Sequence, residues 1–325
     1  MAKSSVALVG ATGKTGKSIL NGLAEDGTFD ITLIVRPQSV SKPSTQALAS
    51  RGFPILPIDA SVAIDPSLLK PFSIIISAID NFAYADESRL ATAAKAAGVQ
   101  RFVPCGFTTV APPGGIMSLR DAKEVSYNHI LQLKLGYTFI DVGFWHQISF
   151  PRVPSGKLDY ALFKGMKHTE IIGDGEAKNL LTDLRDIGRF VARIVKDPRT
   201  LNKKVVTWSD ELSQNEIFKL VEKLTGETVE RDHVSNEEAL KEVTEARAPF
   251  AGAAPKAFDG TAVRLWGAEY TLSKYVREDN TLKNALYLGY LDARELYPDF
   301  VPIAFEETVK ETVEGKAPKM YEGRF

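Results

Sequence analysis

Three glycines spaced three residues apart lie near the start of the chain, in the segment GATGKTG at residues 10–16. The segment follows an apolar run and precedes a helical pattern, which predicts a turn between a strand and a helix. Without side chains, Gly10, Gly13 and Gly16 let the backbone turn sharply and bring its N–H groups close to a phosphate. The amino end of the following helix adds partial positive charge. We therefore predict a dinucleotide-binding loop formed by Gly10, Thr12, Gly13, Lys14, Thr15 and Gly16.

A basic residue ends the next apolar run, at Arg36 in the segment IVRPQS. In dinucleotide sites an acidic residue at this point accepts hydrogen bonds from a ribose 2′-hydroxyl, whereas an arginine can pair with a 2′-phosphate. Ser39 and Lys42 follow closely and are expected to help. The pattern predicts NADP(H) as the cofactor, and the structural alternative is a solvated surface arginine.

Two later apolar segments end in further candidate cofactor contacts. Asp59 ends the segment FPILPID and is a candidate for the adenine edge, with a simple capping role as the alternative. Ser77, Ala78 and Ile79 end the segment SIIISAI. Ligands of open parallel sheets bind beyond the carboxyl ends of the strands, near the switch in strand order, so we expect these three residues to line the cofactor.

The elements that must position these residues alternate along the first half of the chain. Short apolar runs typical of strands buried on both faces lie at residues 5–10, 31–36, 53–59, 73–79, 101–107 and 137–144. Helical patterns separate them, which predicts an α/β fold with a doubly wound parallel sheet of about six strands. This alternating pattern ends at a Pro- and Gly-rich stretch, so we predict one domain over 1–150 and a smaller α/β lobe over 151–325. A helix near 183–197 is expected to pack back on the first domain.

Composition excludes several classes of function. Forty Lys and Arg against 41 Asp and Glu give a net charge of -1, which predicts no nucleic-acid partner. The single cysteine, Cys105, and four scattered histidines predict neither an intrachain disulfide nor a metal site. No apolar run is long enough to span a membrane, and the segment before the first run is too short for a secretion signal. We expect a cytoplasmic protein, a monomer or a homodimer, with no membrane partner.

The chain resembles the atypical short-chain reductases that include isoflavone reductase, phenylcoumaran benzylic ether reductase and pinoresinol-lariciresinol reductase, together with the NmrA-like proteins of fungi. The resemblance extends over nearly the whole sequence. It is carried by GATGKTG, IVRPQS, RFVPCGF, GDGEAKNLLTDLRDIGRFVARIVKDPRTLNKKV and LSQNEIFKLVEKLTGETVER. It implies an NADPH-dependent enzyme with a Rossmann domain and a small substrate-binding lobe.

The resemblance also implies a catalytic lysine. In that family the lysine lies on the helix before the strand that begins here at Tyr137, and the matching position is Lys123. An amine beside the nicotinamide can lose solvation and exchange a proton with a substrate hydroxyl while hydride moves. Tyr127, one helical turn further on, would project from the same face and could assist. The structural alternative is an ordinary charged residue on a helix face.

This sequence departs from the family where RFVPCGF replaces the Pro-Ser-Glu-Phe-Gly pattern. Cys105 and Gly106 stand in place of Ser-Glu, so one acidic group is missing and the substrates of the plant enzymes do not carry over. Cys105 is expected to be a small buried residue beside the cofactor, because no partner base is evident.

Aromatic residues just past a strand end are candidates for the substrate pocket, where an apolar ring would lie over the nicotinamide. The alternative for each is a place in the aromatic core. The predicted pocket residues are Phe107, Met117, Phe144, Trp145, His146 and Phe150.

These features favour an NADPH-dependent reductase that transfers hydride to a small apolar, aromatic metabolite, with Lys123 as proton donor or acceptor. Two alternatives keep the cofactor. One is an NmrA-like regulator that senses the dinucleotide without turnover. The other is an enzyme that uses the dinucleotide as a scaffold for a cyclisation or rearrangement without redox chemistry.

Overall fold

The computed structural model describes residues 3–80, 82–163, 168–252, 255 and 257–318. The chain forms two compact units, and each unit consists of three segments rather than one of the contiguous ranges of the sequence analysis. Unit 1 comprises Met1–Phe107, Ala122–Asp141 and Leu184–Val205. Unit 2 comprises Thr108–Asp121, Val142–Asp183 and Val206–Phe325.

Unit 1 is built on a five-stranded parallel sheet in the order β3-β2-β1-β4-β5. In register, Val6 of β1 pairs with Ile31 of β2 on one side and with Ile74 of β4 on the other. This order is that of a doubly wound Rossmann sheet, and the predicted fold class is confirmed. The strands of the unit are β1 Ser4–Val9, β2 Phe29–Val35, β3 Ile55–Pro57, β4 Ile74–Ser77, β5 Arg101–Val103, β6 Thr138–Asp141 and β10 Lys203–Val206.

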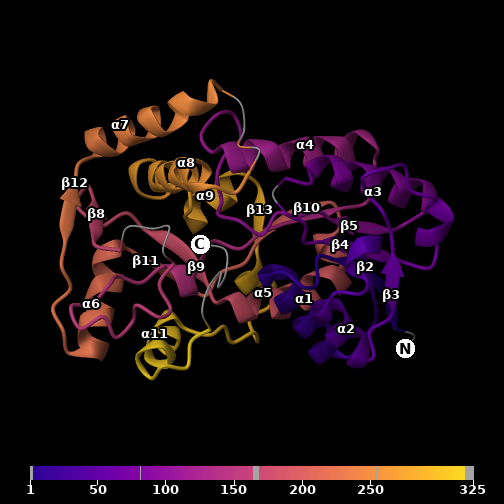
Figure 1. Ribbon diagram of the computed structural model, residues 1–325, viewed down its shortest axis with the longest axis horizontal. Coiled ribbons are helices and arrows are strands. Elements are labelled where there is room, and N and C mark those ends of the chain that lie inside the picture. The colour runs from indigo at the N-terminus through magenta and orange to yellow at the C-terminus, as the bar shows by residue number, and fades with distance from the viewer. Residues whose placement is uncertain (1–2, 81, 164–167, 253–254, 256, 319–325) are drawn as a thin grey trace. The chain divides into compact units, whose positions relative to one another are not determined.

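Helices cover both faces of this sheet. Figure 1 shows α3 and α4 along one face and α1, α2 and α5 along the other. Helix α5 packs closely on α1, where the Ser18 hydroxyl accepts a hydrogen bond from the Gly188 N–H at 2.9 Å and donates to the Arg185 carbonyl at 3.3 Å. The helix bounds are α1 Lys14–Asp26, α2 Pro43–Ser50, α3 Tyr84–Ala97, α4 Ser118–Gln132 and α5 Leu184–Lys196.

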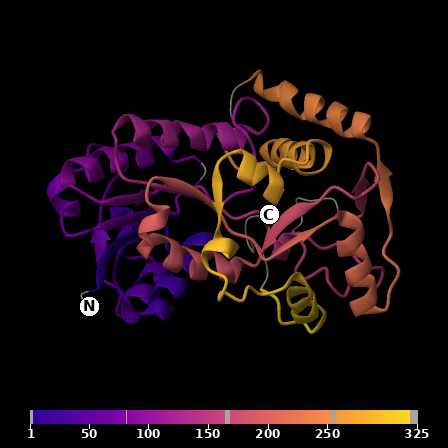
Figure 2. The same ribbon diagram turned by 180° about the vertical axis from the view of Figure 1, so that it is seen from behind.

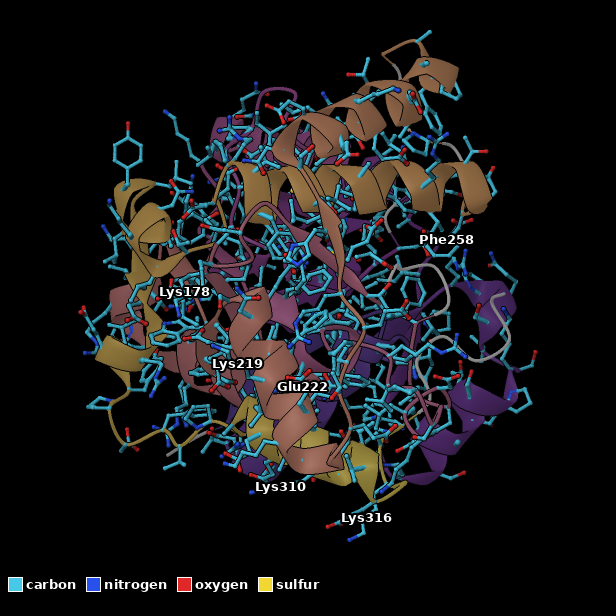
Figure 3. All side chains as sticks on the ribbon, turned by 90° about the vertical axis from the view of Figure 1, so that its left-hand side faces the viewer. Lys178, Lys219, Glu222, Phe258, Lys310 and Lys316 are labelled. Atoms are coloured by element: carbon cyan, nitrogen blue, oxygen red, sulfur yellow. The ribbon has the colours of Figure 1, made fainter. Side chains whose placement is uncertain are left out.

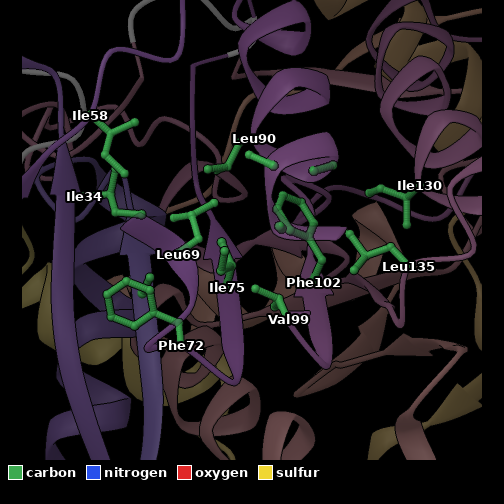
Figure 4. Packing of buried hydrophobic residues seen from close by; sticks show 14 of the residues in the cluster. Ile34, Ile58, Leu69, Phe72, Ile75, Leu90, Val99, Phe102, Ile130 and Leu135 are labelled. Atoms are coloured by element: carbon green, nitrogen blue, oxygen red, sulfur yellow. The ribbon is translucent and has the colours of Figure 1, made fainter. Parts of the chain in front are cut away.

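A continuous apolar core fills the space between the sheet and helices α3 and α4 (Figure 4). Ile75 and Phe102 project from the strands and meet Leu90 of α3 and Ile130 of α4. Each side chain of this size contributes roughly 1.5–3 kcal/mol when fully buried. Burial on both faces explains why the strand sequences are nearly continuous apolar runs.

The prediction of about six strands in one parallel sheet is wrong for the last strand. Only a single parallel bridge, between Phe102 and Tyr137, links this region to β5. Pro104 follows β5 directly and has no N–H to continue the hydrogen-bonded ladder, so the pairing stops there. Strand β6 instead neighbours β10 in a separate sheet.

Unit 2 contains two small sheets and most of the helices in the second half of the chain. One sheet has the order β11-β9-β7, and β8 pairs in parallel with β12. The strands are β7 Phe144–Trp145, β8 Glu170–Ile172, β9 Asn179–Thr182, β11 Asp210–Leu212, β12 Asp232–Val234 and β13 Tyr290–Asp292. The helices are α6 Gln214–Thr225, α7 Asn236–Arg247, α8 Gly260–Thr271, α9 Leu282–Tyr287, α10 Ala293–Leu296 and α11 Phe305–Val313.

Local sequence signals fix the starts of two helices of unit 2. Ser213 before α6 and Ser235 before α7 each form a capping box with the glutamate three residues later, Glu216 and Glu238. Both boxes satisfy backbone N–H groups that the first helical turn leaves without partners.

Helices α7 and α8 lie side by side, as Figure 2 shows from behind. Val243 of α7 packs with Leu265 and Leu272 in a small apolar cluster. Beyond Thr271, α8 continues into a π-helical turn, Leu272–Val276. No helix in the described part of the chain is both long enough and apolar enough to cross a membrane.

Candidate functional site

The glycine loop of unit 1 wraps tightly around the end of β1. Gly10 has a positive φ of 82°, and a Cβ at this position would lie 2.1 Å from the Ala78 carbonyl oxygen. A Cβ on Gly16 would lie 2.1 Å from the Gly10 carbonyl oxygen. Any larger residue at either position would displace the backbone, so both glycines are required by the observed turn.

The amino end of α1 can receive an anion. Gly13 is the N-cap residue and offers no side chain to accept hydrogen bonds from the first helical turn. Such N–H groups, together with the helix dipole, form a common phosphate site. Thr12 is exposed, and Lys14 and Thr15 are half-buried next to these groups. The residues present therefore fit the pyrophosphate of a dinucleotide.

The second predicted group of cofactor contacts follows β2. Arg36 is exposed directly after the strand, Ser39 is half-buried in the short turn that follows, and Lys42 is exposed at the start of α2. The carboxyl ends of parallel strands meet at one edge of a sheet, so these residues share an edge with the glycine loop. Two cations beside a half-buried hydroxyl suit a phosphate group.

Asp59 after β3 has a clear local role. Its Oδ1 accepts hydrogen bonds from the Ser61 N–H at 2.9 Å and from the Ser61 hydroxyl at 2.6 Å. These bonds hold the pKa of the Asp59 carboxyl below its usual value. The capping role is therefore visible in the structure, and an adenine contact stays a prediction.

Of the residues predicted at the end of β4, Ile79 contacts Cys105. Ser77 is fully buried, whereas Ala78 and Ile79 are half-buried. The Cys105 thiol donates to the Ile79 carbonyl oxygen at 3.3 Å. Burial raises the pKa of the Cys105 thiol to about 11, so at neutral pH the group is an unreactive thiol rather than a nucleophile.

The backbone N–H and the backbone carbonyl of Cys105, which belong to successive peptide groups, are each held by a buried ionisable residue. The Lys123 Nζ donates to the Cys105 carbonyl oxygen at 2.8 Å, and Lys123 is only 4% exposed. The Glu87 Oε1 accepts from the Cys105 N–H at 2.8 Å. Burial raises the pKa of Glu87, while the Ser77 side chain, the Cys105 N–H, the Ser126 side chain and the Lys123 charge oppose that rise.

Tyr127 lies one turn after Lys123 and approaches Gly106. Its ring stacks on Phe139 with centroids 3.9 Å apart. A Cβ on Gly106 would lie 2.5 Å from the Tyr127 hydroxyl and 2.5 Å from the Ile140 carbonyl oxygen. The glycine is therefore needed where it stands, and the structure brings Lys123 and Tyr127 together around Cys105 and Gly106.

Glu87 is a residue of this site that the sequence analysis missed. A helical-period signal for it exists, because Glu87, Leu90, Ala91 and Ala94 form the buried stripe of α3. A carboxylate on an apolar stripe is unusual unless it has partners. Glu87 therefore supplies a buried acidic group beside Cys105 from α3.

Phe144 and Phe150, predicted for the substrate, line one pocket of unit 2, a cavity of about 50 Å³. Lys274 and Tyr275 of the π-helical turn line the same cavity, and the sequence analysis missed both. No local signal marks Lys274, because the wider π turn departs from the helical period that reveals buried faces.

The remaining predicted pocket residues lie elsewhere. Trp145 is half-buried and does not line this cavity. Met117 is buried, with its sulfur 3.9 Å from the Thr109 hydroxyl. Phe107, in unit 1, has a positive φ of 49°, which is strained for a bulky residue, and its N–H donates to the Ile140 carbonyl oxygen at 2.7 Å.

His146 belongs to a buried polar cluster rather than to the cavity. Its Nδ1 lies 3.0 Å from the Thr308 hydroxyl and 3.8 Å from Asp183 Oδ2. Its Nε2 lies 3.5 Å from Asp210 Oδ2. Because Thr308 is on α11, this cluster joins that helix to the strands of unit 2 and serves the fold.

Comparison with known proteins gives consistent matches over most of the chain. The family model described as the NmrA-like family matches residues 2–255. The asnovolin J 5′,6′-dehydrogenase nvfM of Aspergillus novofumigatus is 43% identical over 95% of this chain and 95% of its own length. The isoflavone reductase homolog IRL of Zea mays is 30% identical over 91% of this chain and 94% of its own length.

A solved structure shares the fold. The binary complex of leucoanthocyanidin reductase with NADPH from Vitis vinifera superimposes with a TM-score of 0.75 at 21% sequence identity. The match covers 96% of this chain and 100% of that one. At this level of identity the likeness concerns the architecture alone.

Proposed function

The chain belongs to the NmrA-like family, as the sequence resemblance predicted, and from this premise we propose that it is an NADPH-dependent oxidoreductase of the isoflavone reductase-like type acting on a small apolar, aromatic metabolite. The named relatives include a dehydrogenase and a reductase homolog. The observation that carries the proposal is the buried Lys123, fixed on the Cys105 carbonyl in the same unit as the glycine loop.

The cofactor is assigned to unit 1. The glycine loop and the amino end of α1 would hold the pyrophosphate, and Arg36, with Ser39 and Lys42, would hold a 2′-phosphate. Ser77, Ala78, Ile79 and Cys105 would line the nicotinamide side. When bound, NADPH supplies the hydride, and the protein supplies orientation and proton management.

Lys123 is assigned the proton transfer. An ammonium has three N–H donors, and the Cys105 carbonyl takes one of them, which fixes the direction of the amine. The other N–H groups can meet a substrate oxygen. Glu87 accepts from the Cys105 N–H, in the preceding peptide group, so it helps to fix the backbone of the residue whose carbonyl holds Lys123. Tyr127 is assigned a supporting hydrogen bond from the same helix face.

The substrate ring is assigned to aromatic residues of unit 2. Phe144 and Phe150 line a cavity together with Ile217 and Phe218, and these side chains favour a flat apolar group. Trp145, Met117 and Phe107 stay candidates for contacts to the rest of the molecule. His146 is assigned to the buried polar cluster described above.

Calorimetric titration with NADPH and NADH, followed by a turnover assay, tests the proposal. We expect selective NADPH binding. We also expect either oxidation of asnovolin J with NADP⁺ or reduction of apolar aromatic enones with NADPH. Lys123→Met should abolish this turnover while cofactor binding persists. Selective binding without any turnover would favour the dinucleotide-sensing regulator. Conversion of substrate that requires the cofactor without consuming it would favour the scaffold enzyme. No binding of either nucleotide would refute all three functions.

A further inference from the structure

A buried lysine lies outside the proposed catalytic group, on the π-helical turn that follows α8. Lys274 is 3% exposed, and its Nζ lies 3.5 Å from the ring centroid of Phe144 and 4.6 Å from that of Tyr275. The turn projects its side chains in directions that a regular helix does not offer, and π-helical turns occur frequently at functional sites.

The Lys274 amine has few polar neighbours. Its Nζ lies 3.3 Å from the Tyr275 hydroxyl, and no carboxylate in the described part of the chain contributes to its titration. Burial alone lowers the pKa of Lys274 to about 7. Burial also raises the pKa of Tyr275, so that phenol stays protonated. Near neutral pH a large share of the molecules therefore carries an uncharged amine with an available lone pair.

The Lys274 side chain borders a cavity. Phe144, Phe150, Ile217 and Phe218 supply apolar walls. Lys274 lines the same space, together with the polar residues Ser149, His168, Glu170 and Gln214. The volume of about 50 Å³ exceeds the ~10–15 Å³ that one water molecule needs. It is too small for a whole metabolite, so it suits the polar end of a ring whose remainder extends outward.

The chemistry of this cavity selects a hydrogen-bond donor. An uncharged amine is a strong acceptor, and in a buried site a hydrogen bond to it is worth more than in water. A weakly acidic hydroxyl enters uncharged and donates to the lone pair. A carboxylate would have to lose its hydration, and the Glu170 side chain of the same cavity would oppose its charge.

We propose that Lys274 is the polar anchor of a ligand pocket in unit 2, where it accepts a hydrogen bond from the weakly acidic hydroxyl, a phenol or an enol, of a ring-bearing apolar ligand. The inference rests on the proposed function only where it identifies this ligand as the substrate. Binding to the pocket itself can be measured without cofactor.

Binding of 4-ethylphenol to the whole protein, measured by calorimetry without nucleotide, tests the proposal. Because the uncharged amine accepts the bond, affinity should rise roughly tenfold between about pH 6 and about pH 8. The methyl ether 4-ethylanisole, which cannot donate, should bind more weakly and show no such rise. The other titratable groups lining the cavity are His168, Glu170 and Tyr275.

Two lysine variants complete the test. Lys274→Met keeps an unbranched side chain of similar length without the amine, and should reduce phenol affinity to that of the ether at every pH. Lys219→Met is the matched control, since Figure 3 shows Lys219 on the outer surface of α6, and it should bind the phenol as the unmodified protein does.

Three results would overturn the assignment: phenol affinity that does not depend on pH, affinity that falls as pH rises, or affinity that survives in a folded Lys274→Met variant. The same pH comparison of phenol and ether in a His168→Gln variant, where the difference should persist, decides the question even if Lys274→Met fails to fold. Phenol binding with the expected pH dependence in a protein that does not bind NADPH would support the pocket and refute the proposed function separately.

Discussion

Two buried lysines, one in each unit, have opposite surroundings. Lys123 donates to the Cys105 carbonyl and lies near the Glu87 carboxyl, a setting with acceptors for an ammonium group. Lys274 is buried to a similar degree but faces aromatic rings, and burial lowers its pKa to about 7. Burial by itself thus says little about what a lysine does, because the neighbouring polar atoms decide whether the amine acts as a donor or as an acceptor.

The largest expected difference between the roles of the two lysines is in the kinetics of turnover. Lys123→Met should lower kcat by about 10²- to 10⁴-fold, the range for loss of a general acid or base, and leave NADPH affinity unchanged. Lys274→Met should mainly raise KM, because its amine binds the substrate hydroxyl. Steady-state kinetics and calorimetry on both variants check this, with Lys219→Met as control. Equal losses of kcat in both variants would contradict the division of roles.

The pH dependence of the free energy of unfolding should also distinguish Lys274 from Lys123. In the unfolded chain the Lys274 pKa returns to its usual 10.5, so between about pH 7 and 10.5 the unfolded state binds more protons. The free energy of unfolding should therefore rise with pH across that window. Lys274→Met should be more stable than the unmodified protein at pH 7 by on the order of 2–5 kcal/mol, with the difference shrinking toward pH 10.

Urea denaturation at several pH values measures this effect. Lys219→Met should follow the unmodified protein throughout, because Lys219 is exposed in the folded state. A Lys274→Met variant with unchanged stability at pH 7 would mean that the amine is better solvated than its 3% exposure indicates.

A cofactor variant tests whether the two units act separately. Arg36→Asp should weaken NADPH binding by about 1.5–3 kcal/mol, the value of a charged hydrogen bond, and affect NADH much less. It should leave binding of 4-ethylphenol to the Lys274 pocket unchanged. Calorimetry with all three ligands measures this, and equal weakening of NADPH and NADH would refute the role of Arg36.

The smallest expected effect concerns Glu87. Glu87→Gln keeps an oxygen for the Cys105 N–H but removes the carboxyl, so kcat should fall only about fivefold, which corresponds to ~1 kcal/mol. Burial raises the Glu87 pKa, so the free energy of unfolding should fall as pH rises and the carboxyl ionises. Glu87→Gln removes this ionisation, so the variant should lose less stability between acid and neutral pH. A pH series of kcat and of thermal unfolding checks both; a loss as large as that of Lys123→Met would make Glu87 a direct participant.

Much of unit 1 could be predicted from the sequence, because its signals are local. The apolar runs placed the first five strands within a few residues, and the helical patterns between them correctly indicated helices there. The glycine spacing placed a loop at the end of β1, where Gly10 and Gly16 are sterically required. For the second lobe the sequence analysis predicted only a smaller α/β unit, although the capping boxes at Ser213 and Ser235 are local signals for the starts of α6 and α7.

Only the tertiary structure decided which segments belong together and which polar residues are buried. The chain enters each unit three times, and α5 lies on α1 although a segment of unit 2 precedes it. His146 resembled a pocket residue in sequence, yet Asp183 and Thr308 from distant segments enclose it. Periodicity shows which face of a regular element is buried, but the partners of that face come from remote segments. For Lys274 even the helical period gives no indication of burial, because its π turn does not follow the 3.6-residue spacing of an α-helix.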